Sequence, residues 1–364
     1  GGIAFRRMPL PLSMKHLAIV ISLLALAVPG WAQQFEEKID VNAVLLDVIV
    51  TDNKGNQILG LTKDDFVVKE NGVAQEVDSV DYFTNRQLLD AREQDAPFKV
   101  EKVREDRYFV FFFDKPEDPG VLFDQLSQAR RAVREFVRED MKPTDYVAIA
   151  GHDVRLKVWS DFTNDKAKLE RALEDSARFG KGESQAQGEG PSILRGLDQS
   201  LLDKRTGSVY EALDVLAEAV RPIRARKNLV LFSPGIVDIG ETVRAGMIVN
   251  RSRYLDPALR SLNAANVSVY SVQLQRPTDT EVSTTPLFHQ RLTELASETG
   301  GEYFMSGASF KPTVKRVEKT NAGYYLVTYR SQKPRGEKGF QKVDVSLKNP
   351  EFRIVARSGY EFGS

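Results

Sequence analysis

The sequence predicts an α/β domain with a mostly parallel sheet, inserted between two β-rich segments at the ends of the chain. Three observations support this prediction. Apolar strand-like runs alternate with amphipathic helical stretches over residues 107–306, a pattern typical of parallel sheets covered by helices. Period-two alternation interrupted by turn residues fills residues 36–84 and 318–364. Neither end segment alone is expected to form a stable sheet, so we expect the two segments to pack together as one β-sandwich.

The composition is that of an ordinary globular protein and excludes several function classes. The 364 residues are 41% hydrophobic and 28% charged, with a formal net charge of zero. Nucleic acid is therefore not expected as a partner, because nucleic-acid-binding proteins carry clustered basic charge. The sequence has no cysteine, which excludes disulfides, thiolate metal ligands and a lipid-modified cysteine anchor.

Residues 1–32 predict a signal peptide with an N-terminal extension. A basic pair follows Met14, an apolar run covers residues 17–28, and small residues precede the expected cleavage after about Ala32. This apolar run is too short to span a bilayer comfortably. We therefore expect an exported chain, periplasmic or secreted, without a stable membrane anchor. Residues 1–13 match an upstream start or an expression remnant, and the sequence leaves open whether they are translated natively.

The central region has a defined order of expected elements after a polar connector at 85–106. Strands at 145–153 and 155–162 must be antiparallel neighbours, because a parallel crossover needs a dozen or more residues. The other elements expected along this region are a strand at 107–114, a helix from about 126, a helix at 165–179, a mobile glycine-rich loop at 180–190, a helix at 209–220, a strand at 228–235, a helix at 256–266, a strand at 267–274, a helix at 289–301 and a short strand at 302–305.

Candidate functional residues follow the strand at 107–114. The run "RYFVFFFD" ends in Asp114, and Glu117 and Asp118 follow within four positions. Carboxylates this close repel one another unless a cation, a hydrogen-bond donor or water screens them. Such a turn is compatible with a divalent cation, with acid–base or nucleophilic chemistry, or with the start of a helix.

The order of elements and the two flanking blocks resemble a known family. The central order, ending in "LASETGGEYF", resembles a von Willebrand factor A domain, whose sheet is parallel except for one short edge strand. The flanks "VLLDVIVTDNKGNQILGLTKDDFVVKENGVAQEV" and "NAGYYLVTYRS…FQKVDVSLKNPEFRIVARSGYEF" resemble the exported von Willebrand A-related proteins abundant in Acidobacteria. The resemblance covers nearly the whole chain after the signal, and the flanks are more specific than the core.

The resemblance implies a metal-ion-dependent adhesion site for Mg²⁺ or Mn²⁺ at the carboxyl end of the sheet. Typical domains supply Asp-x-Ser-x-Ser from the first loop, a Thr from a later loop and an Asp from a later strand end. Asp114 matches the first Asp, whereas Pro116 and Asp118 stand at the two Ser positions. The Thr position falls on Gly207, and Ser233 replaces the final Asp.

We therefore expect a degenerate site and no cofactor. Thr206 and Ser208 lie beside the Thr position and would substitute for it after a small shift. In one interpretation, Asp118 or Asp124 begins the following helix and Asp114 accepts backbone N–H groups. In the other, Asp114, Glu117 and Asp118 bind Mg²⁺ or Mn²⁺ in a non-standard way. The missing hydroxyl ligands favour the first interpretation.

The expected function is that of an exported, non-catalytic protein-binding or scaffold protein with an unidentified protein ligand. The alternative is a metal-dependent adhesion module or a hydrolase that uses the acidic turn Asp114–Asp118. An enzyme is disfavoured because no Gly-x-Ser-x-Gly elbow surrounds Ser233, and His152 and His289 form no catalytic pattern. The residues expected on the partner face are Asp114, Glu117, Asp118, Thr206, Ser208 and Ser233.

Overall fold

The computed structural model divides the chain into the units Gly1–Ile39 and Asp40–Ser364. The predicted signal peptide and most of the predicted connector lie outside the residues that the structure describes. Those residues are 39–84, 100–101, 106–115, 119–236, 242–244, 247–250, 253–274, 285–305, 309–334 and 338–363.

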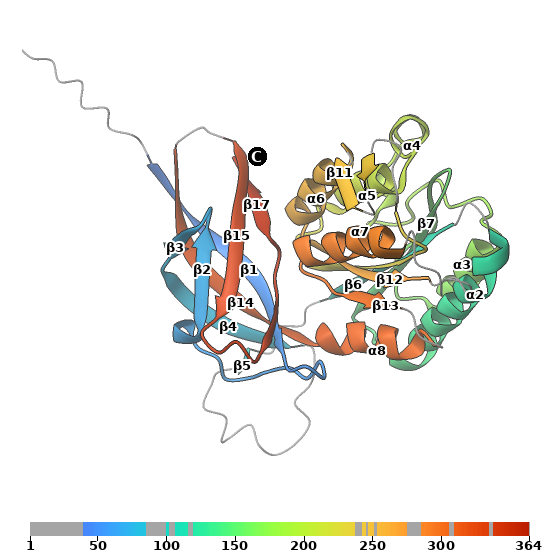
Figure 1. Ribbon diagram of the computed structural model, residues 1–364. Helices are drawn as coiled ribbons and strands as arrows, with labels where there is room; N and C mark the ends of the chain where they lie inside the picture. The colour runs from blue at the N-terminus through green and yellow to red at the C-terminus, as the bar shows by residue number, and fades with distance from the viewer. Residues whose placement is uncertain are drawn as a thin grey trace, which may run out of the picture. The chain divides into compact units, whose positions relative to one another are not determined.

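A six-stranded sheet of order β13-β12-β9-β6-β7-β8 forms the centre of the α/β region (Figure 1). Neighbouring strands are parallel throughout, except for the antiparallel pair β7–β8 at one edge. The structure thus confirms the predicted mixed α/β architecture with a mostly parallel sheet. Its strands are β6 (Arg107–Asp114), β7 (Asp145–Asp153), β8 (Arg155–Thr163), β9 (Lys227–Ser233), β12 (Val267–Gln273) and β13 (Tyr303–Met305).

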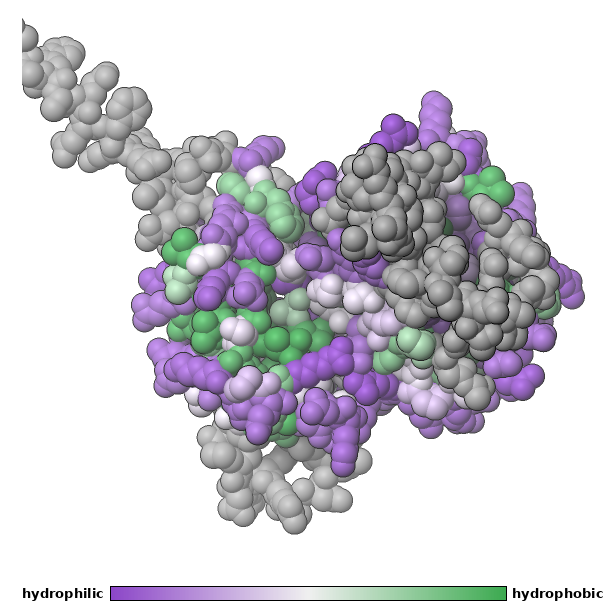
Figure 2. Space-filling model, in the orientation of Figure 1, coloured by the Kyte–Doolittle hydropathy of each residue, from purple (hydrophilic) through white to green (hydrophobic). Residues whose placement is uncertain are grey.

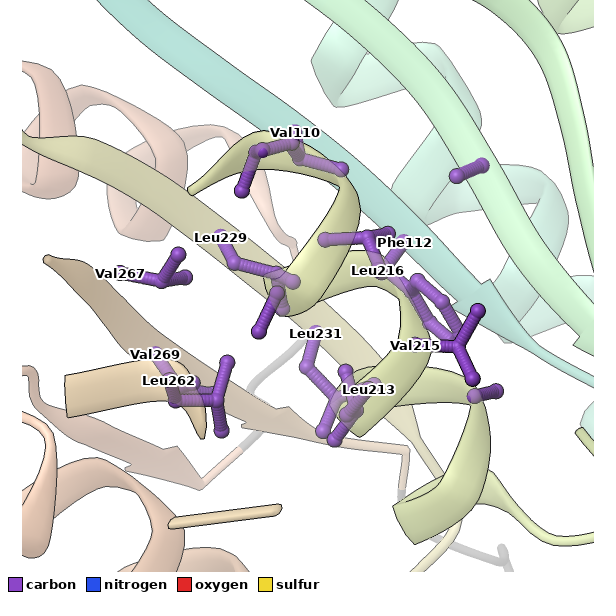
Figure 3. Packing of buried hydrophobic residues seen from close by; sticks show 14 of the residues in the cluster. Val110, Phe112, Leu213, Val215, Leu216, Leu229, Leu231, Leu262, Val267 and Val269 are labelled. Atoms are coloured by element: carbon purple, nitrogen blue, oxygen red, sulfur yellow. The ribbon is translucent and has the colours of Figure 1, made fainter. Parts of the chain in front are cut away.

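Helices cover both faces of this sheet because alternate residues of its strands point to opposite sides. Phe109, Phe111 and Phe113 of β6 pack with α2 (Pro119–Glu135), the π-helical turn Phe136–Asp140, α3 (Lys166–Ala177) and α8 (Lys311–Thr320). Val110 and Phe112 pack on the other side with α5 (Val209–Val220), α6 (Leu255–Ala264) and α7 (Thr285–Glu298). Figure 3 shows part of this second cluster, with Leu216 of α5 beside Phe112. The shorter elements are the 3₁₀ turn Leu194–Gly196, α4 (Gln199–Arg205) and the hairpin of β10 (Thr242–Arg244) with β11 (Met247–Asn250).

The glycine-rich segment after α3 lies along the open edge of β8. The backbone N–H of Glu183 donates to the Val158 carbonyl at 2.7 Å. Farther along, the Asp161 carboxylate accepts the Ser192 hydroxyl at 2.5 Å and the Ile193 N–H at 2.7 Å. An uncovered edge strand offers unpaired backbone groups to other chains. The predicted loop at 180–190 is therefore attached to β8 at Glu183, and residues 192–193, which follow the loop, are attached to β8 as well.

Strands from the two ends of the chain combine in two further sheets, of order β16-β1-β14-β4-β5 and β17-β15-β2-β3. The N-terminal strands β1, β4 and β2 pair antiparallel with the C-terminal strands β16, β14 and β15. One buried cluster contains residues of both sheets, so the chain ends share a core as expected. That the two sheets form a sandwich stays a prediction. The elements are β1 (Ile39–Thr51), the 3₁₀ turn Lys63–Asp65, β2 (Phe66–Glu70), β3 (Val73–Gln75), β4 (Val77–Thr84), β5 (Val100–Glu101), β14 (Gly323–Pro334), β15 (Gly339–Leu347), β16 (Arg353–Val355) and β17 (Gly359–Phe362).

Surface hydropathy differs between the two regions. In the view of Figure 2, hydrophobic residues gather over the β-rich strands of the chain ends, whereas the described surface elsewhere is largely hydrophilic. Leu45, Leu59 and Val73 are the large apolar residues that these β-rich segments expose most. Every helix within the described ranges is too short or too polar to cross a membrane.

Candidate functional site at the carboxyl end of the sheet

Asp114 and Ser233 meet at the carboxyl end of the central sheet. They are the last residues of the adjacent parallel strands β6 and β9. Ser233 is fully buried and donates its hydroxyl to Asp114 Oδ2 at 2.6 Å, and Asp114 is only 5% exposed. The structure thus brings together two of the residues that the sequence nominated. It uses Ser233 as a hydrogen-bond donor to the carboxylate.

Burial dominates the electrostatics of this pair. It raises the pKa of Asp114 to about 7, and the hydrogen bond from Ser233 opposes this shift only in part. His152, near the end of β7, is also buried, and its burial lowers the pKa of the imidazole, which favours the neutral ring. Its Nε2 lies 3.1 Å from the Thr206 carbonyl, which can only accept, so Nε2 carries the proton. His152 Nδ1 is 4.0 Å from Asp114 Oδ1, too far for a hydrogen bond.

The hydroxyl groups of the predicted partner face beside the Thr position are engaged in local structure. Thr206 follows α4 and is fully buried, and its Oγ1 donates to the Leu202 carbonyl at 2.5 Å while accepting the Leu156 N–H at 3.1 Å. Ser208 forms a capping box with Glu211 at the start of α5, where each side chain accepts the other's backbone N–H. Both hydroxyls therefore stabilise helix ends and chain turns.

Several nominated residues lie outside the described part of the chain. Pro116, Glu117 and Asp118 belong to this group. The place of Glu117 and Asp118 on the partner face, and of Pro116 and Asp118 in the degenerate site, therefore stays a prediction. Gly207 is exposed, and a Cβ there would lie 3.4 Å from Arg155 Nη1, so the position is not closed to a side chain. Among the described residues, no group of three or more His, Cys, Asp or Glu side chains is placed to hold a metal ion.

The described donor set does not fit the divalent cation that the resemblance implies. Mg²⁺ and Mn²⁺ need about six oxygen ligands in near-octahedral geometry. Asp114 Oδ2 already accepts the Ser233 hydroxyl, and the Thr206 hydroxyl already bonds one acceptor and one donor of the backbone. Within the described residues, one carboxylate and one serine oxygen are fewer ligands than such an ion needs, and the other two predicted carboxylates, Glu117 and Asp118, lie outside those residues.

Three large hydrophobic side chains are exposed around this end of the sheet. Phe123 in α2 is 51% exposed, Val154 between β7 and β8 is 71% exposed, and Met305 at the end of β13 is 57% exposed. Because α2 follows β6, and β7 and β13 run parallel to the central strands, all three lie at the carboxyl end. We call Phe123, Val154 and Met305 the apolar rim. No sequence pattern revealed it, because each residue is a single apolar position whose exposure depends on the tertiary fold.

Val154 combines exposure with backbone strain. Its φ of +63° is in the left-handed region, where a β-branched residue is a genuine outlier. This conformation costs roughly 1–2 kcal/mol for a residue with a Cβ. Arg155 Nη1 donates to the Val154 carbonyl at 2.9 Å, which helps to hold the turn. Strain at an exposed position is typical of functional surfaces, where the side chain is kept although glycine would relax the backbone.

The solved structures that resemble this chain and are described here have low sequence identity to it. No family model and no curated protein matches the chain. Among solved structures, an aerotolerance-related membrane protein from Bacteroides fragilis, solved with multiple mutations to serines, is 15% identical, with a TM-score of 0.38, over 59% of this chain and 98% of its own. The conserved hypothetical protein BatB from Bacteroides thetaiotaomicron is 13% identical, with a TM-score of 0.38, over 58% and 96%. The human COPII-coat protein Sec24c is 9% identical, with a TM-score of 0.36, over 71% and 43%.

The class of the protein is therefore defined by the strand arrangement itself. A six-stranded, mostly parallel sheet with one antiparallel edge strand agrees with the von Willebrand A-like fold expected from the resemblance. The Acidobacterial type of the resemblance stays a prediction.

Proposed function

We propose that the chain is an exported, non-catalytic protein-binding or scaffold protein whose partner docks at the carboxyl end of the central sheet. The observation that supports this most is Val154, a valine that is 71% exposed and held in a left-handed conformation. Phe123 and Met305 are two further exposed apolar residues at the same end of the sheet. Burial of these side chains by a protein partner would stabilise the complex.

The buried groups beneath the apolar rim support recognition by protein surface alone. The Ser233 hydroxyl is donated to Asp114, and the Thr206 and Ser208 hydroxyls stabilise local structure. A metal-mediated docking mode would need such hydroxyls as free ligands. In this proposal the predicted adhesion site is degenerate and binds no metal. Asp114 instead accepts the buried hydrogen bond from Ser233 and so stabilises the structure below the docking face.

The geometry also favours a non-catalytic role. A serine nucleophile has to be accessible and hydrogen-bonded to a general base that a third group orients. Ser233 is fully buried and is bonded to a carboxylate, and His152 is too far from that carboxylate to take its proton. The proposal includes export through the predicted signal peptide and a β-sandwich built from both chain ends. It also includes membership of the exported Acidobacterial type.

Glycine substitutions at two exposed valines test the proposal. Val154→Gly should leave the free energy of unfolding unchanged or raise it by up to about 1 kcal/mol, because relief of left-handed strain outweighs the entropy of an added glycine. Val73→Gly, at a 64% exposed position in strand β3, should lower it by about 0.5–1 kcal/mol. Chemical denaturation of the two variants measures both changes.

The same two variants separate binding from stability. The chain from residue 33, immobilised and exposed to culture fluid or envelope extract of its native host, is expected to retain a partner. Val73→Gly should retain that partner as the unmodified chain does, whereas Val154→Gly should lose most of it despite its equal or greater stability. Equal retention of the partner by both variants would show that Val154 does not contact it and would contradict the proposal.

The metal-dependent alternative has its own test. Millimolar Mn²⁺ or Mg²⁺ is expected to leave the thermal unfolding temperature of the chain unchanged. A genuine site occupied at 100 times its dissociation constant would add about 2.7 kcal/mol of stability, which is easily measured. Stoichiometric metal in the purified chain that disappears in Asp114→Ala would overturn the degenerate-site view and favour the adhesion module.

A further inference from the structure

Asn71 and Gly72 form the exposed two-residue turn between β2 and β3. Their φ angles are +48° and +84°, the left-handed backbone for which Asn-Gly is a preferred hairpin sequence. The strands pair right up to the turn, where Glu70 faces Val73. Asn71–Gly72 is also the only Asn-Gly pair in the sequence, which makes it the position most exposed to one particular chemical change.

This change is the spontaneous loss of ammonia from the asparagine side chain. The Gly72 nitrogen forms a bond to Asn71 Cγ and loses its proton, while the bond from Cγ to Nδ2 breaks and ammonia leaves with that proton. Glycine favours the attack because its nitrogen is not hindered by a side chain. Water then opens the resulting cyclic imide at either carbonyl group, which gives aspartate or isoaspartate.

In the folded chain, β15 holds the Asn71 amide in place. The Asn71 backbone N–H donates to the Lys342 carbonyl at 2.8 Å, and the Lys342 N–H donates to Asn71 Oδ1 at 3.1 Å. Because a backbone N–H only donates, the amide oxygen must face Lys342. Asn71 Nδ2 donates to Gln341 Oε1. Both polar atoms of the side chain are therefore bonded to β15.

We propose that Asn71 is a site of spontaneous conversion to aspartate and isoaspartate, and that its contact with β15 slows the reaction in the folded chain. The amide has to leave Lys342 and Gln341 before Cγ can turn toward the Gly72 nitrogen. Each hydrogen bond that must break first slows the attack by up to about tenfold. The pairing of Glu70 with Val73 also opposes rotation of the peptide between Asn71 and Gly72.

The site lies beside a buried contact between the two ends of the chain. Glu70, directly before Asn71, accepts the hydroxyls of Tyr329 and Ser331 in β14. Isoaspartate adds a carbon atom to the backbone, and the length of a hairpin turn fixes the register of its strands. Conversion to isoaspartate therefore disturbs the turn next to this contact, whereas the bonds to β15 preserve it.

Incubation of the purified chain at mildly alkaline pH, folded in buffer and unfolded in urea, tests the proposal. Peptide mass spectrometry measures the fraction converted at Asn71 over time. Conversion in the folded chain is expected to be at least about tenfold slower than in the unfolded chain. Equal rates would show that the fold does not protect Asn71, and an absence of product in both states would show that it is not a modification site. Either result would overturn the proposal.

Variants of Gln341 test whether β15 is responsible. Gln341→Ala removes the acceptor of Asn71 Nδ2 and should speed conversion in the folded chain by about threefold to tenfold. Gln341→Glu keeps an acceptor oxygen and should stay near the wild-type rate. Gln75→Ala, in β3 of the same hairpin, leaves the Asn71 amide bonded and serves as the matched control.

The rates in urea should be the same for all four proteins, because the unfolded chains share the Asn71–Gly72 sequence. A Gln341→Ala chain that converts no faster than Gln75→Ala would show that β15 does not restrain the amide, and the proposal would be wrong. If Gln341→Ala does not fold, the comparison of folded with unfolded wild-type chain still decides the question.

Discussion

Replacing Glu70 by alanine is expected to lower the free energy of unfolding by about 3–5 kcal/mol. Glu70, at the end of β2, is buried and accepts three hydroxyl groups: Tyr329 at 2.7 Å, Ser331 at 2.7 Å and Tyr360 at 2.8 Å. Alanine would remove the charged acceptor that these three buried hydroxyls share, and each lost hydrogen bond of this kind costs roughly 1–3 kcal/mol. Burial and the neighbouring Glu70 also raise the pKa of Tyr329, so its hydroxyl stays a donor.

The hydroxyl groups that Glu70 accepts come from a part of the chain far from Glu70 in the sequence. Glu70 belongs to the N-terminal β segment, whereas Tyr329 and Ser331 lie in β14 and Tyr360 lies in β17. One carboxylate therefore fastens the beginning of the chain to its end. We infer that the α/β region is held between its flanks by this network as well as by the backbone pairing of β2 with β15.

Two control variants make the Glu70 prediction specific. Glu70→Gln keeps one acceptor oxygen in nearly the same place and should cost less than half as much as Glu70→Ala. Glu76→Ala, at an exposed position between β3 and β4, should change the free energy of unfolding by no more than about 0.5 kcal/mol. Urea denaturation measures all three. If Glu70→Ala behaves like Glu76→Ala, the network does not join the chain ends.

The long buried elements were predictable from the sequence because their patterns are strong. β6 and β9 are buried at every residue and therefore appear as near-continuous apolar runs. The predicted start of the first helix near residue 126 was late, because α2 begins at Pro119. Proline is favoured in the first turn of a helix, and the apolar stripe becomes visible only from Leu122 onward.

The elements that the sequence did not reveal lack a periodic apolar face. α4 has no buried residue, so nothing in its sequence separates it from a polar loop. Only Val314, Val317 and Thr320 are buried in α8, and the rest of that helix is charged or polar. Such helices depend on tertiary contacts that a single sequence does not display.

The candidate site was predictable in position but not in detail. Parallel strands end at the same edge, so the meeting of Asp114 and Ser233 follows from the strand pattern. The direction of the Ser233 hydroxyl and the nearness of His152 depend on the tertiary fold. His152 is buried near the carboxylate, which no pattern in the sequence indicated. The left-handed backbone conformation of Val154 could not be predicted from the sequence either, because valine predicts an extended backbone.

Replacing Lys227 by methionine is expected to raise the free energy of unfolding at pH 7 by about 2–4 kcal/mol. Lys227, the first residue of β9, is 1% exposed and donates from Nζ to the Ile223 carbonyl at 2.5 Å. Burial lowers the pKa of its ammonium to about 7; Arg357 adds to this shift and Asp47 opposes it. Each pKa unit corresponds to 1.36 kcal/mol, and exchanging a buried charge for an apolar side chain is often stabilising.

The sign of the pH dependence follows from the direction of this shift. An unfolded Lys227 keeps the ordinary lysine pKa of 10.5, whereas the folded residue releases its proton near pH 7. Between these values the unfolded chain binds a proton that the folded chain does not, so the stability of the wild-type chain rises with pH. The advantage of Lys227→Met should therefore be fully present at pH 7 and below, and should shrink steadily toward pH 10.

Denaturation of both proteins from pH 6 to pH 10 measures this difference directly, since titrations shared by wild type and variant cancel. Lys204→Met, at an exposed position in the last turn of α4, should show no comparable gain at any pH. A Lys227→Met variant less stable than wild type at pH 7 would mean that Asp47 and the Ile223 carbonyl stabilise the charged ammonium, so that burial does not dominate. A gain that is independent of pH would show that improved packing, rather than removal of a buried charge, accounts for it.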